Sequence, residues 1–410
     1  MAAAQGELLG RWNELLDRVR AKVPFYRDRL PAGRLTSLEQ VSDVPFTTKE
    51  DFRANYPFGL FAVPAEQVVR VHMSSGTTGR PVVTGYTRTD LELWSECMAR
   101  VLGAAGTGAA DVVQNAYGYG LFTGGFGFHM GAERLGALVI PTSSGVTQRQ
   151  VMVMRDLGST ILTCTPSYAL VLAEAVEREG AASDLRLRAG FFGAEPWSEG
   201  MRAQIERGLG LEAFDIYGLT ELGGPGVGVE CTHHEGLHVF EDHFYPEVVD
   251  PESGRPLVPG EEGELVLTSL RREASPVLRY RTRDRTVLVD KPCSCGSPFR
   301  RILKLRGRTD DMLVVRGENV FPSQIESIVL DVEGLSGNYQ LVVDRQLRRL
   351  DSLEVRVEAH ADADREQLGR RAEERVRDTI GLGVRVTVLP PGALPRSEGK
   401  ARRVVDLREL

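Results

Sequence analysis

A run of hydroxyl residues and glycines lies near the start of the chain, from Ser74 to Gly79. It reads Ser-Ser-Gly-Thr-Thr-Gly, and Arg80 and Pro81 follow it directly. Glycine permits left-handed and closely approaching backbone, so such a loop can turn several N–H groups and hydroxyls toward one anion. The common Gly-x-x-x-x-Gly-Lys-Ser/Thr phosphate loop has a different glycine spacing and a lysine before its hydroxyl. The run therefore predicts a polyphosphate cradle of another kind, and an ordinary polar surface loop is the alternative.

A second polar cluster follows an apolar run, where Asp215-Ile216-Tyr217 leads into Gly218-Leu219-Thr220-Glu221. Ligands of α/β proteins bind beyond the carboxyl ends of strands, so these side chains are candidates for a site. Tyr217 could stack on a base, Thr220 could contact phosphate, and Glu221 could hold Mg²⁺ through oxygen. An unremarkable strand-to-loop turn is the competing interpretation.

Three further polar segments lie toward the C-terminal end. Asp284 ends the run Tyr280-Arg281-Thr282-Arg283-Asp284 and carries a carboxylate suited to a ribose diol, although pairing with a neighbouring arginine is a strong alternative. The run Gly307-Arg308-Thr309-Asp310-Asp311-Met312 lies where the sequence pattern changes. Lys400 ends the run Pro395-Arg396-Ser397-Glu398-Gly399-Lys400, which alone reads as a solvated loop.

Two cysteine-containing segments have the composition of a metal site. Cys231-Thr232-His233-His234 precedes Cys293-Ser294-Cys295-Gly296 by about 60 residues. Two thiolates one residue apart and a Cys/His pair supply a closed tetrahedral set, which is typical of structural zinc. We predict Cys231, His234, Cys293 and Cys295 as ligands. The sequence does not decide between His233 and His234, and free surface thiols with a solvated histidine pair are the alternative.

Composition restricts the class of protein. The 410 residues suffice for two to three domains, and 42% hydrophobic with 26% charged residues is ordinary for a globular protein. A net charge of −7 argues against general nucleic-acid binding. We expect no membrane span and no secretory signal, because no long apolar run occurs and the first residues lack cations. The odd count of five cysteines suits a reducing cytoplasm.

Hydrophobic periodicity predicts an α/β fold in two parts. From about residue 90 to 220, helical patterns alternate with short apolar runs that read as buried parallel strands. A β-rich region with Pro/Gly turns follows. Beyond about residue 308 the order β-α-β-β-α-β indicates a small α+β split-βαβ domain. We therefore predict a large multi-subdomain α/β N-terminal domain over residues 1–307 and a small C-terminal domain over 308–410.

Taken together and in order, these motifs resemble those of the adenylate-forming acyl- and aryl-CoA ligases. The connecting stretches Asn115–Gly125, Gly193-Ala194-Glu195-Pro196-Trp197, Glu241–Glu247 and Asp311–Gly317 are similar to the phenylacetate–CoA ligase branch in particular. The resemblance covers about residues 10 to 405. It implies a two-step reaction, in which a carboxylate attacks the α-phosphate of ATP and a thiol, usually that of coenzyme A, then displaces AMP.

The resemblance also implies roles for single residues. Lys400 would bridge the carboxylate and the α-phosphate, Thr220 would contact phosphate, and Glu221 would hold Mg²⁺. Asp310 would be the hinge about which the small domain turns between the half-reactions. The residues expected to bind the nucleotide are Ser74, Ser75, Gly76, Thr77, Thr78, Gly79, Gly193, Ala194, Glu195, Pro196, Asp215, Tyr217, Gly218, Asp284 and Arg308.

The glycine- and aromatic-rich segment from Tyr117 to Gly125 would line the acyl site in this branch. Glycine lets a flat ring approach the backbone, and aromatic side chains can stack on it, so an aromatic acid fits better than a long fatty acid. A glycine-rich structural loop is the alternative. The residues expected to contact the acid are Tyr117, Tyr119, Gly120, Phe122 and Gly124.

We therefore expect a cytoplasmic, AMP-forming aryl-acid:CoA ligase that uses ATP, Mg²⁺ and coenzyme A and carries a structural Zn²⁺. Transfer of the aryl group to a carrier-protein pantetheine or another nucleophile is the alternative, and a non-catalytic nucleotide-binding relative is a third. The sequence leaves open which aromatic acid is used, which thiol accepts it, and whether the chain forms a homodimer.

Overall fold

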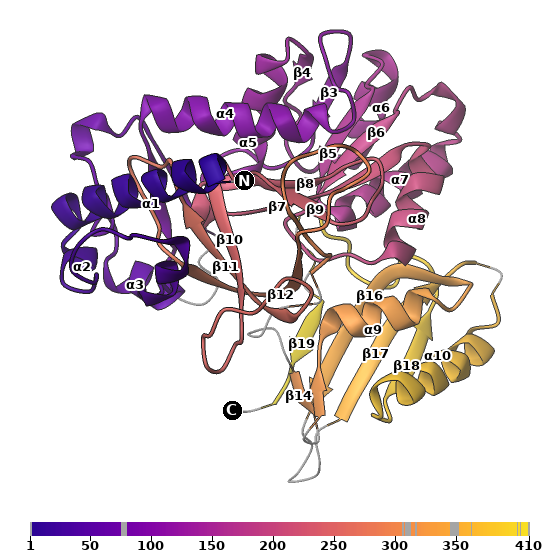
Figure 1. Ribbon diagram of the computed structural model, residues 1–410. Helices are drawn as coiled ribbons and strands as arrows, with labels where there is room; N and C mark the ends of the chain where they lie inside the picture. Colours follow the sequence, from indigo (N-terminus) through magenta and orange to yellow (C-terminus); the bar gives the residue numbers. More distant parts are fainter. Residues whose placement is uncertain are drawn as a thin grey trace. The chain divides into compact units, whose positions relative to one another are not determined.

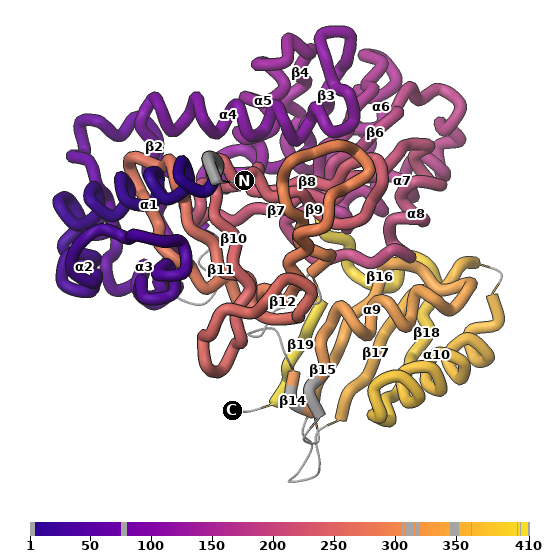
Figure 2. The backbone as a smooth tube through the Cα atoms, in the orientation of Figure 1, coloured from indigo at the N-terminus to yellow at the C-terminus, as the bar shows by residue number. Residues whose placement is uncertain are grey.

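The structure is a computed structural model that describes residues 2–74, 80–305, 307, 313–315, 318–344, 352–361, 363–399, 401 and 403–408. The chain divides into two compact units, one of Met1–Ser143 with Phe214–Lys304 and the other of Ser144–Ala213 with Leu305–Leu410. Figures 1 and 2 show the course of the chain. Within the described residues, every helix is too short or too polar to cross a lipid bilayer.

The first unit combines helices with a largely antiparallel sheet. Its N-terminal part contains α1 (Ala2–Lys22), α2 (Pro24–Arg27), η1 (Leu38–Asp43), α3 (Lys49–Ala54), η2 (Ala65–Gln67), β1 (Arg70–Met73), β2 (Val83–Tyr86), α4 (Arg88–Gly103), β3 (Val112–Asn115), α5 (Gly124–Arg134) and β4 (Leu138–Ile140). Its second part contains β7 (Glu212–Leu219), η4 (Thr220–Leu222), β8 (Gly224–Glu230), β9 (Leu237–Val239), β10 (Phe244–Val249), β11 (Glu262–Ser269), β12 (Tyr280–Val289) and β13 (Arg301–Ile302).

Strand pairing in this unit changes from parallel to antiparallel. β3 and β4 pair in parallel, whereas β10, β11, β12, β13, β9, β8 and β7 are neighbours in that order and pair antiparallel. Helix α1 packs on β10 through buried Trp12, whose ring meets that of Tyr245 edge-on at 5.5 Å. The apolar runs of the sequence therefore form the predicted strands.

The second unit contains the remaining α/β segment and the C-terminal elements. Its α/β segment consists of α6 (Thr147–Asp156), β5 (Ile161–Cys164), α7 (Pro166–Glu179), η3 (Ala182–Asp184), β6 (Ala189–Phe192) and α8 (Glu199–Leu209), with β5 and β6 parallel. The C-terminal elements are β14 (Leu313–Val315), β15 (Glu318–Val320), α9 (Pro322–Leu330), β16 (Leu335–Asp344), β17 (Ser352–Ala359), α10 (Arg365–Ile380), β18 (Arg385–Leu389) and β19 (Val404–Asp406).

The C-terminal sheet has the order β18-β17-β16-β19, with α9 and α10 packed against it around one apolar core (Figure 2). The predicted strands and helices of this region are present. Two short strands were not predicted: β15 pairs with β14, and β19 joins β16 in parallel. The boundary predicted at residues 307 and 308 stays a prediction.

Candidate active site

The base of the predicted phosphate loop is closed by Ser74. β1 and β2 form an antiparallel pair in which Met73 lies opposite Val83. Just beyond this pair, the Ser74 N–H donates to the Val82 carbonyl at 3.0 Å and the Val82 N–H donates to Ser74 Oγ at 2.9 Å. The two hydrogen bonds fix where the loop leaves and rejoins the strands. Ser75, Gly76, Thr77, Thr78 and Gly79 lie outside the described residues.

Strand β1 also holds the aromatic segment that the sequence assigned to the acid. The Met73 N–H donates to the Leu121 carbonyl at 2.9 Å, and His72 Nδ1 lies 3.1 Å from the same oxygen. A carbonyl can only accept, so Nδ1 carries the proton. Burial lowers the pKa of His72, which keeps the ring neutral among the rings of Tyr86, Trp94 and Phe126. The phosphate-loop strand and the aromatic segment are thus neighbours.

Within this segment, aromatic rings pack closely against the backbone of glycines. Tyr117 is buried and stacks on Phe128 at 5.3 Å with an interplanar angle of 4°. A Cβ at Gly124 would lie 2.6 Å from the Phe122 ring and 3.2 Å from the Tyr117 ring, so no larger residue fits there. Gly120 is exposed and has φ +119°, a conformation that favours glycine.

The Tyr119 hydroxyl is held in a polar network at the edge of the segment. It accepts from Asn115 Nδ2 at 2.7 Å and lies 3.1 Å from His129 Nδ1. Burial raises the pKa of Tyr119 to about 12, so the hydroxyl stays protonated at neutral pH. It can therefore donate one hydrogen bond to a neighbouring acceptor.

The end of β7 brings two predicted nucleotide residues together. Tyr217 and Asp284 are both buried, and the Tyr217 hydroxyl donates to Asp284 Oδ2 at 2.5 Å. The next residue, Gly218, lies at a bulge where a Cβ would come 2.3 Å from the Gly224 carbonyl. Asp215, deeper in β7, is also buried, and its N–H donates to Glu230 Oε2 at 2.8 Å. The bulge follows Tyr217 directly, so the hydrogen-bonded pair of Tyr217 and Asp284 lies near the C-terminal end of β7.

Thr220 and Glu221 form the short helix η4 directly beyond this strand, and both are largely buried. The turn is tied to the phosphate-loop hairpin, because the Tyr86 hydroxyl of β2 donates to the Gly223 carbonyl at 3.0 Å. It also packs on the aromatic segment, since a Cβ at Gly224 would lie 2.8 Å from the Thr123 side chain. Ser74 at the base of the phosphate loop, the aromatic segment of residues 117–125 and the Glu221 carboxylate of η4 therefore all belong to the first unit.

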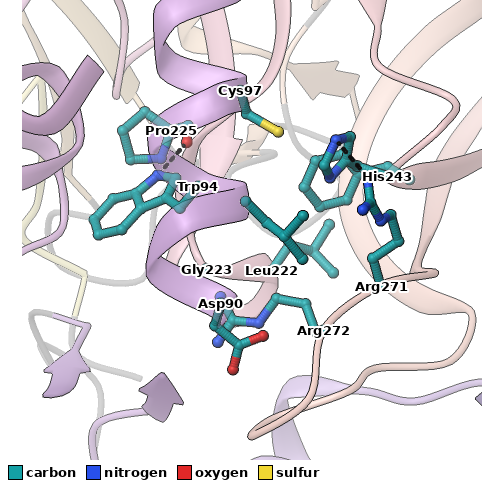
Figure 3. Close-up of a pocket in the computed structure, with 11 residues that line it drawn as sticks. Asp90, Trp94, Cys97, Leu222, Gly223, Pro225, His243, Arg271 and Arg272 are labelled. Atoms are coloured by element: carbon teal, nitrogen blue, oxygen red, sulfur yellow. Dashed lines mark hydrogen bonds between the residues drawn. The ribbon is translucent and has the colours of Figure 1, made fainter. Parts of the chain in front are cut away.

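Leu222 of η4, Gly223 and Pro225 are among the residues that line a small cavity of about 30 Å³ (Figure 3). Trp94 of α4 donates its Nε1–H to the Pro225 carbonyl at 2.8 Å. His243 and Arg271 also line the cavity. This volume holds about one water molecule, so the cavity does not accommodate an aromatic acid.

The remaining nucleotide residues belong to the second unit. Gly193, Ala194, Glu195 and Pro196 follow β6, and Ala194 has φ +71°. The Glu195 carboxylate does not point freely at a ligand: it accepts from Ser167 N at 2.7 Å and from Ala401 N at 2.9 Å. Sequence reasoning did not find this contact with the C-terminal loop. Arg308, Asp310 and Lys400 lie outside the described residues.

The cysteines gather around a histidine other than the predicted one. Cys231, His238, Cys293 and Cys295 place one ligand atom each within 4.8 Å of the others. His234 instead turns its Nδ1 toward Glu230 Oε2 at 3.3 Å. The histidine of the set is therefore corrected to His238, which lies on β9 opposite Arg301 of β13. The sequence spacing singled out the histidines nearest Cys231, but strand pairing decides which one reaches the thiols.

With this geometry, the comparisons with known proteins identify the class. The family described as AMP-binding enzyme matches residues 15–270, and the AMP-binding enzyme C-terminal domain matches residues 317–408. The chain belongs to the adenylate-forming, AMP-binding enzymes. The expected fold, a large α/β N-terminal domain with a small C-terminal domain, is confirmed.

Within that class, full-length relatives give the branch. The chain is 47% identical to the phenylacetate-coenzyme A ligase of Thermus thermophilus over 100% of this chain and 97% of the relative, and 49% identical to that of Escherichia coli K12 over 95% and 91%. The chain thus belongs to the phenylacetate–coenzyme A ligase branch. A 2-hydroxyisobutyryl-CoA ligase crystallised in the postadenylation state matches with TM-score 0.92 and 29% identity, covering 100% of this chain and 90% of that one.

Proposed function

We propose that the chain activates an aromatic carboxylic acid with ATP and transfers it to coenzyme A. In the first step a carboxylate oxygen attacks the α-phosphorus, and pyrophosphate leaves. In the second step the thiolate of coenzyme A attacks the carbonyl carbon, and AMP leaves with the oxygen that joined it to the acyl group. The observation that carries this proposal is the joining of Ser74, the Tyr117–Gly125 segment and η4 in one unit.

Each group has a role that its surroundings support. The loop closed by Ser74 would receive the β- and γ-phosphates, and buried Asp284, accepting from Tyr217, would receive the ribose hydroxyls. Mg²⁺, when bound by Glu221 beside Thr220, would offset phosphate charge. Lys400 would neutralise the attacking carboxylate and the α-phosphate together, since attack of one anion on another requires positioned cations.

For the acid we propose phenylacetate or a similarly sized aryl acid. The names of the two phenylacetate-coenzyme A ligases given above point to phenylacetate, and the Tyr117–Gly125 segment offers flat aromatic faces next to glycines that admit a ring. The protonated Tyr119 hydroxyl could donate to a ring substituent. Coenzyme A is the proposed acceptor. The cytoplasm is the proposed compartment, in keeping with five cysteines of which none forms a disulfide.

ATP–pyrophosphate exchange over a panel of phenylacetates, benzoates, and hydroxy- and aminobenzoates tests this function. We expect exchange that depends on an added aromatic acid and is strongest with phenylacetate. The productive acid is then assayed with coenzyme A and with a carrier-protein pantetheine, which separates the two acceptors. Absence of exchange with every acid would overturn the proposal.

We also propose a structural zinc held by Cys231, His238, Cys293 and Cys295. Cys231 Sγ and Cys293 Sγ lie 3.7 Å apart, and Cys295 Sγ lies 3.4 Å from His238 Nε2. Two sulfurs bound to one tetrahedral zinc at about 2.3 Å lie about 3.8 Å apart, and a sulfur and a nitrogen about 3.5 Å apart, so the set fits. His238 Nδ1 donates to the Phe299 carbonyl at 3.0 Å, which leaves Nε2 free to bind metal.

The two histidines make a matched test of the zinc. Elemental analysis should find about one zinc per chain in the wild type and in His234→Ala, whereas His238→Ala and Cys293→Ser lose it and unfold at lower temperature. Zinc retained in His238→Ala and lost in His234→Ala would restore the original assignment. Zinc absent from the wild type, with full stability, would exclude the site.

A further inference from the structure

The loop that carries Lys400 is held on both sides of that residue by the α/β segment of the second unit. The Thr165 hydroxyl donates to the Gly399 carbonyl at 3.1 Å, and the Ala401 N–H donates to Glu195 Oε2 at 2.9 Å. Both partners are side chains far away in the sequence. The backbone immediately before and after Lys400 is therefore anchored to residues 165 and 195.

The two anchors meet at the N-terminus of α7. Thr165 is the N-cap of this helix and accepts from Tyr168 N, while Glu195 Oε1 accepts from Ser167 N at 2.7 Å. A carboxylate at this position satisfies N–H groups that lack partners within the helix and interacts favourably with the helix dipole. Glu195 thus uses one oxygen on the helix and the other on the residue after Lys400.

We propose that Glu195 is a positioning residue for Lys400 in the adenylation step. The bridge links the α7 N-terminus to Ala401, the residue that directly follows Lys400 in the chain. The inference rests on the role proposed for Lys400, and it gives the Glu195 side chain a role in addition to the nucleotide contact expected of the segment from Gly193 to Pro196. Because transfer to coenzyme A does not use Lys400, loss of the bridge should impair the first half-reaction alone.

The Glu195→Gln variant tests the bridge with little change in shape. A carboxamide replaces one of the two acceptor oxygens by an NH2 group, which only donates, so either Ser167 N or Ala401 N loses its acceptor. We expect acid-dependent ATP–pyrophosphate exchange at saturating substrates to fall about tenfold or more, since small misplacements of a reacting group are costly. The KM for ATP and the rate of thioester formation from preformed aryl-adenylate should each change less than about twofold. Glu199→Gln is the matched control, because the Glu199 side chain is 68% exposed and pairs with Arg202 at 2.8 Å.

A double-mutant cycle separates positioning from a general structural role. Lys400→Ala should itself lower exchange about a hundredfold and spare thioester formation, and adding Glu195→Gln should then leave the residual exchange and the thioester rate unchanged. Loss of both half-reactions in Glu195→Gln, or unimpaired exchange, would overturn the inference while leaving the role of Lys400 intact. Full exchange in Lys400→Ala would instead overturn the role proposed for the lysine, and the inference with it.

Discussion

Tyr217 and Asp284 are 67 positions apart in the sequence, yet their side chains share a buried hydrogen bond of 2.5 Å. The alternative raised for Asp284 was simple pairing with a neighbouring arginine. Its contact with Tyr217 joins two residues that resemble nucleotide contacts of the family. A fixed, buried carboxylate is pre-organised to accept two hydroxyls of a ribose.

Removing the Tyr217 hydroxyl should therefore weaken ATP binding through Asp284. We expect Tyr217→Phe to raise the KM for ATP about tenfold, the equivalent of about 1.4 kcal/mol, because the ring stays while the charged acceptor loses one donor. Asp284→Asn should have a larger effect.

Steady-state ATP titrations of the exchange reaction measure this, and Tyr119→Phe is the control. Its hydroxyl contacts Asn115 and His129 in the acyl segment, so it should change the KM for the acid and leave that for ATP. An unchanged KM for ATP in Tyr217→Phe would remove this pair from the nucleotide site.

The metal residues show how far sequence reasoning reaches at this scale. The spacing of the cysteines predicts three thiols and an imidazole as zinc ligands. The structure brings Cys231, Cys293 and Cys295 close to one imidazole, and bound zinc stays a prediction. The spacing could not select His238, because the pairing of β9 with β13 brings that residue to the thiols. The contact of Glu195 with Ala401 was missed for the same reason: it joins residues far apart in sequence and has no local signal.

Among the elements, strands formed by apolar runs were predictable, whereas β15 and β19 were not. The buried runs that form β3, β5 and β6 are rich in aliphatic and aromatic residues, which fit buried strands. β19 covers only Val404–Asp406 and exists because it pairs with residues 341–343 of β16. Such long-range pairing is set by the assembled sheet, so a local pattern does not indicate it.

Arg396 connects two elements of the second unit. Its guanidinium reaches Glu174 of α7 at 2.9 Å and Glu358 of β17 at 2.7 Å. The Glu358 side chain is 2% exposed and that of Glu174 is 41% exposed. Burial alone would raise the pKa of Glu358, but hydrogen bonds from Arg396 and from backbone N–H groups outweigh it and lower that pKa.

The two carboxylates should therefore differ in their contributions to stability. Arg396→Met should destabilise the fold by about 3 kcal/mol, because it leaves the buried Glu358 charge unpaired. Glu174→Gln should cost less than about 1 kcal/mol, as expected for a partly exposed pair. Chemical denaturation measures both, and Arg396→Met/Glu358→Gln should recover part of the loss. Equal costs for Arg396→Met and Glu174→Gln would refute the assignment.

Stability of the molecule as a whole should depend on pH through His243. This ring is 4% exposed, and Arg271, Arg100, Asp242 and Glu96 face it. Burial lowers the pKa of His243 to about 4, helped by the arginines and opposed by the carboxylates. As the pH falls, the unfolded state therefore binds a proton on this histidine before the folded state does. The stabilisation of the fold by neutral His243 is complete above about pH 6.5 and is lost as the pH falls to about 4.

Denaturant midpoints between pH 7 and 4 test this. Because of this group, the free energy of unfolding of the wild type should fall by up to about 3 kcal/mol between pH 7 and 4. His243→Gln should be less stable than the wild type at pH 7, but its free energy of unfolding should lack this part of the pH dependence. Identical slopes in the two proteins would show that His243 titrates normally.

The central claim for the whole molecule is that the acid is activated as an acyl-adenylate. Purified enzyme is given ATP, coenzyme A and phenylacetate labelled with ¹⁸O in both carboxylate oxygens, and the products are analysed by mass spectrometry. Attack of the carboxylate on the α-phosphorus predicts one ¹⁸O in each AMP, unlabelled pyrophosphate and one ¹⁸O in the thioester. Label in inorganic phosphate together with formation of ADP, or unlabelled AMP alongside thioester, would contradict the mechanism.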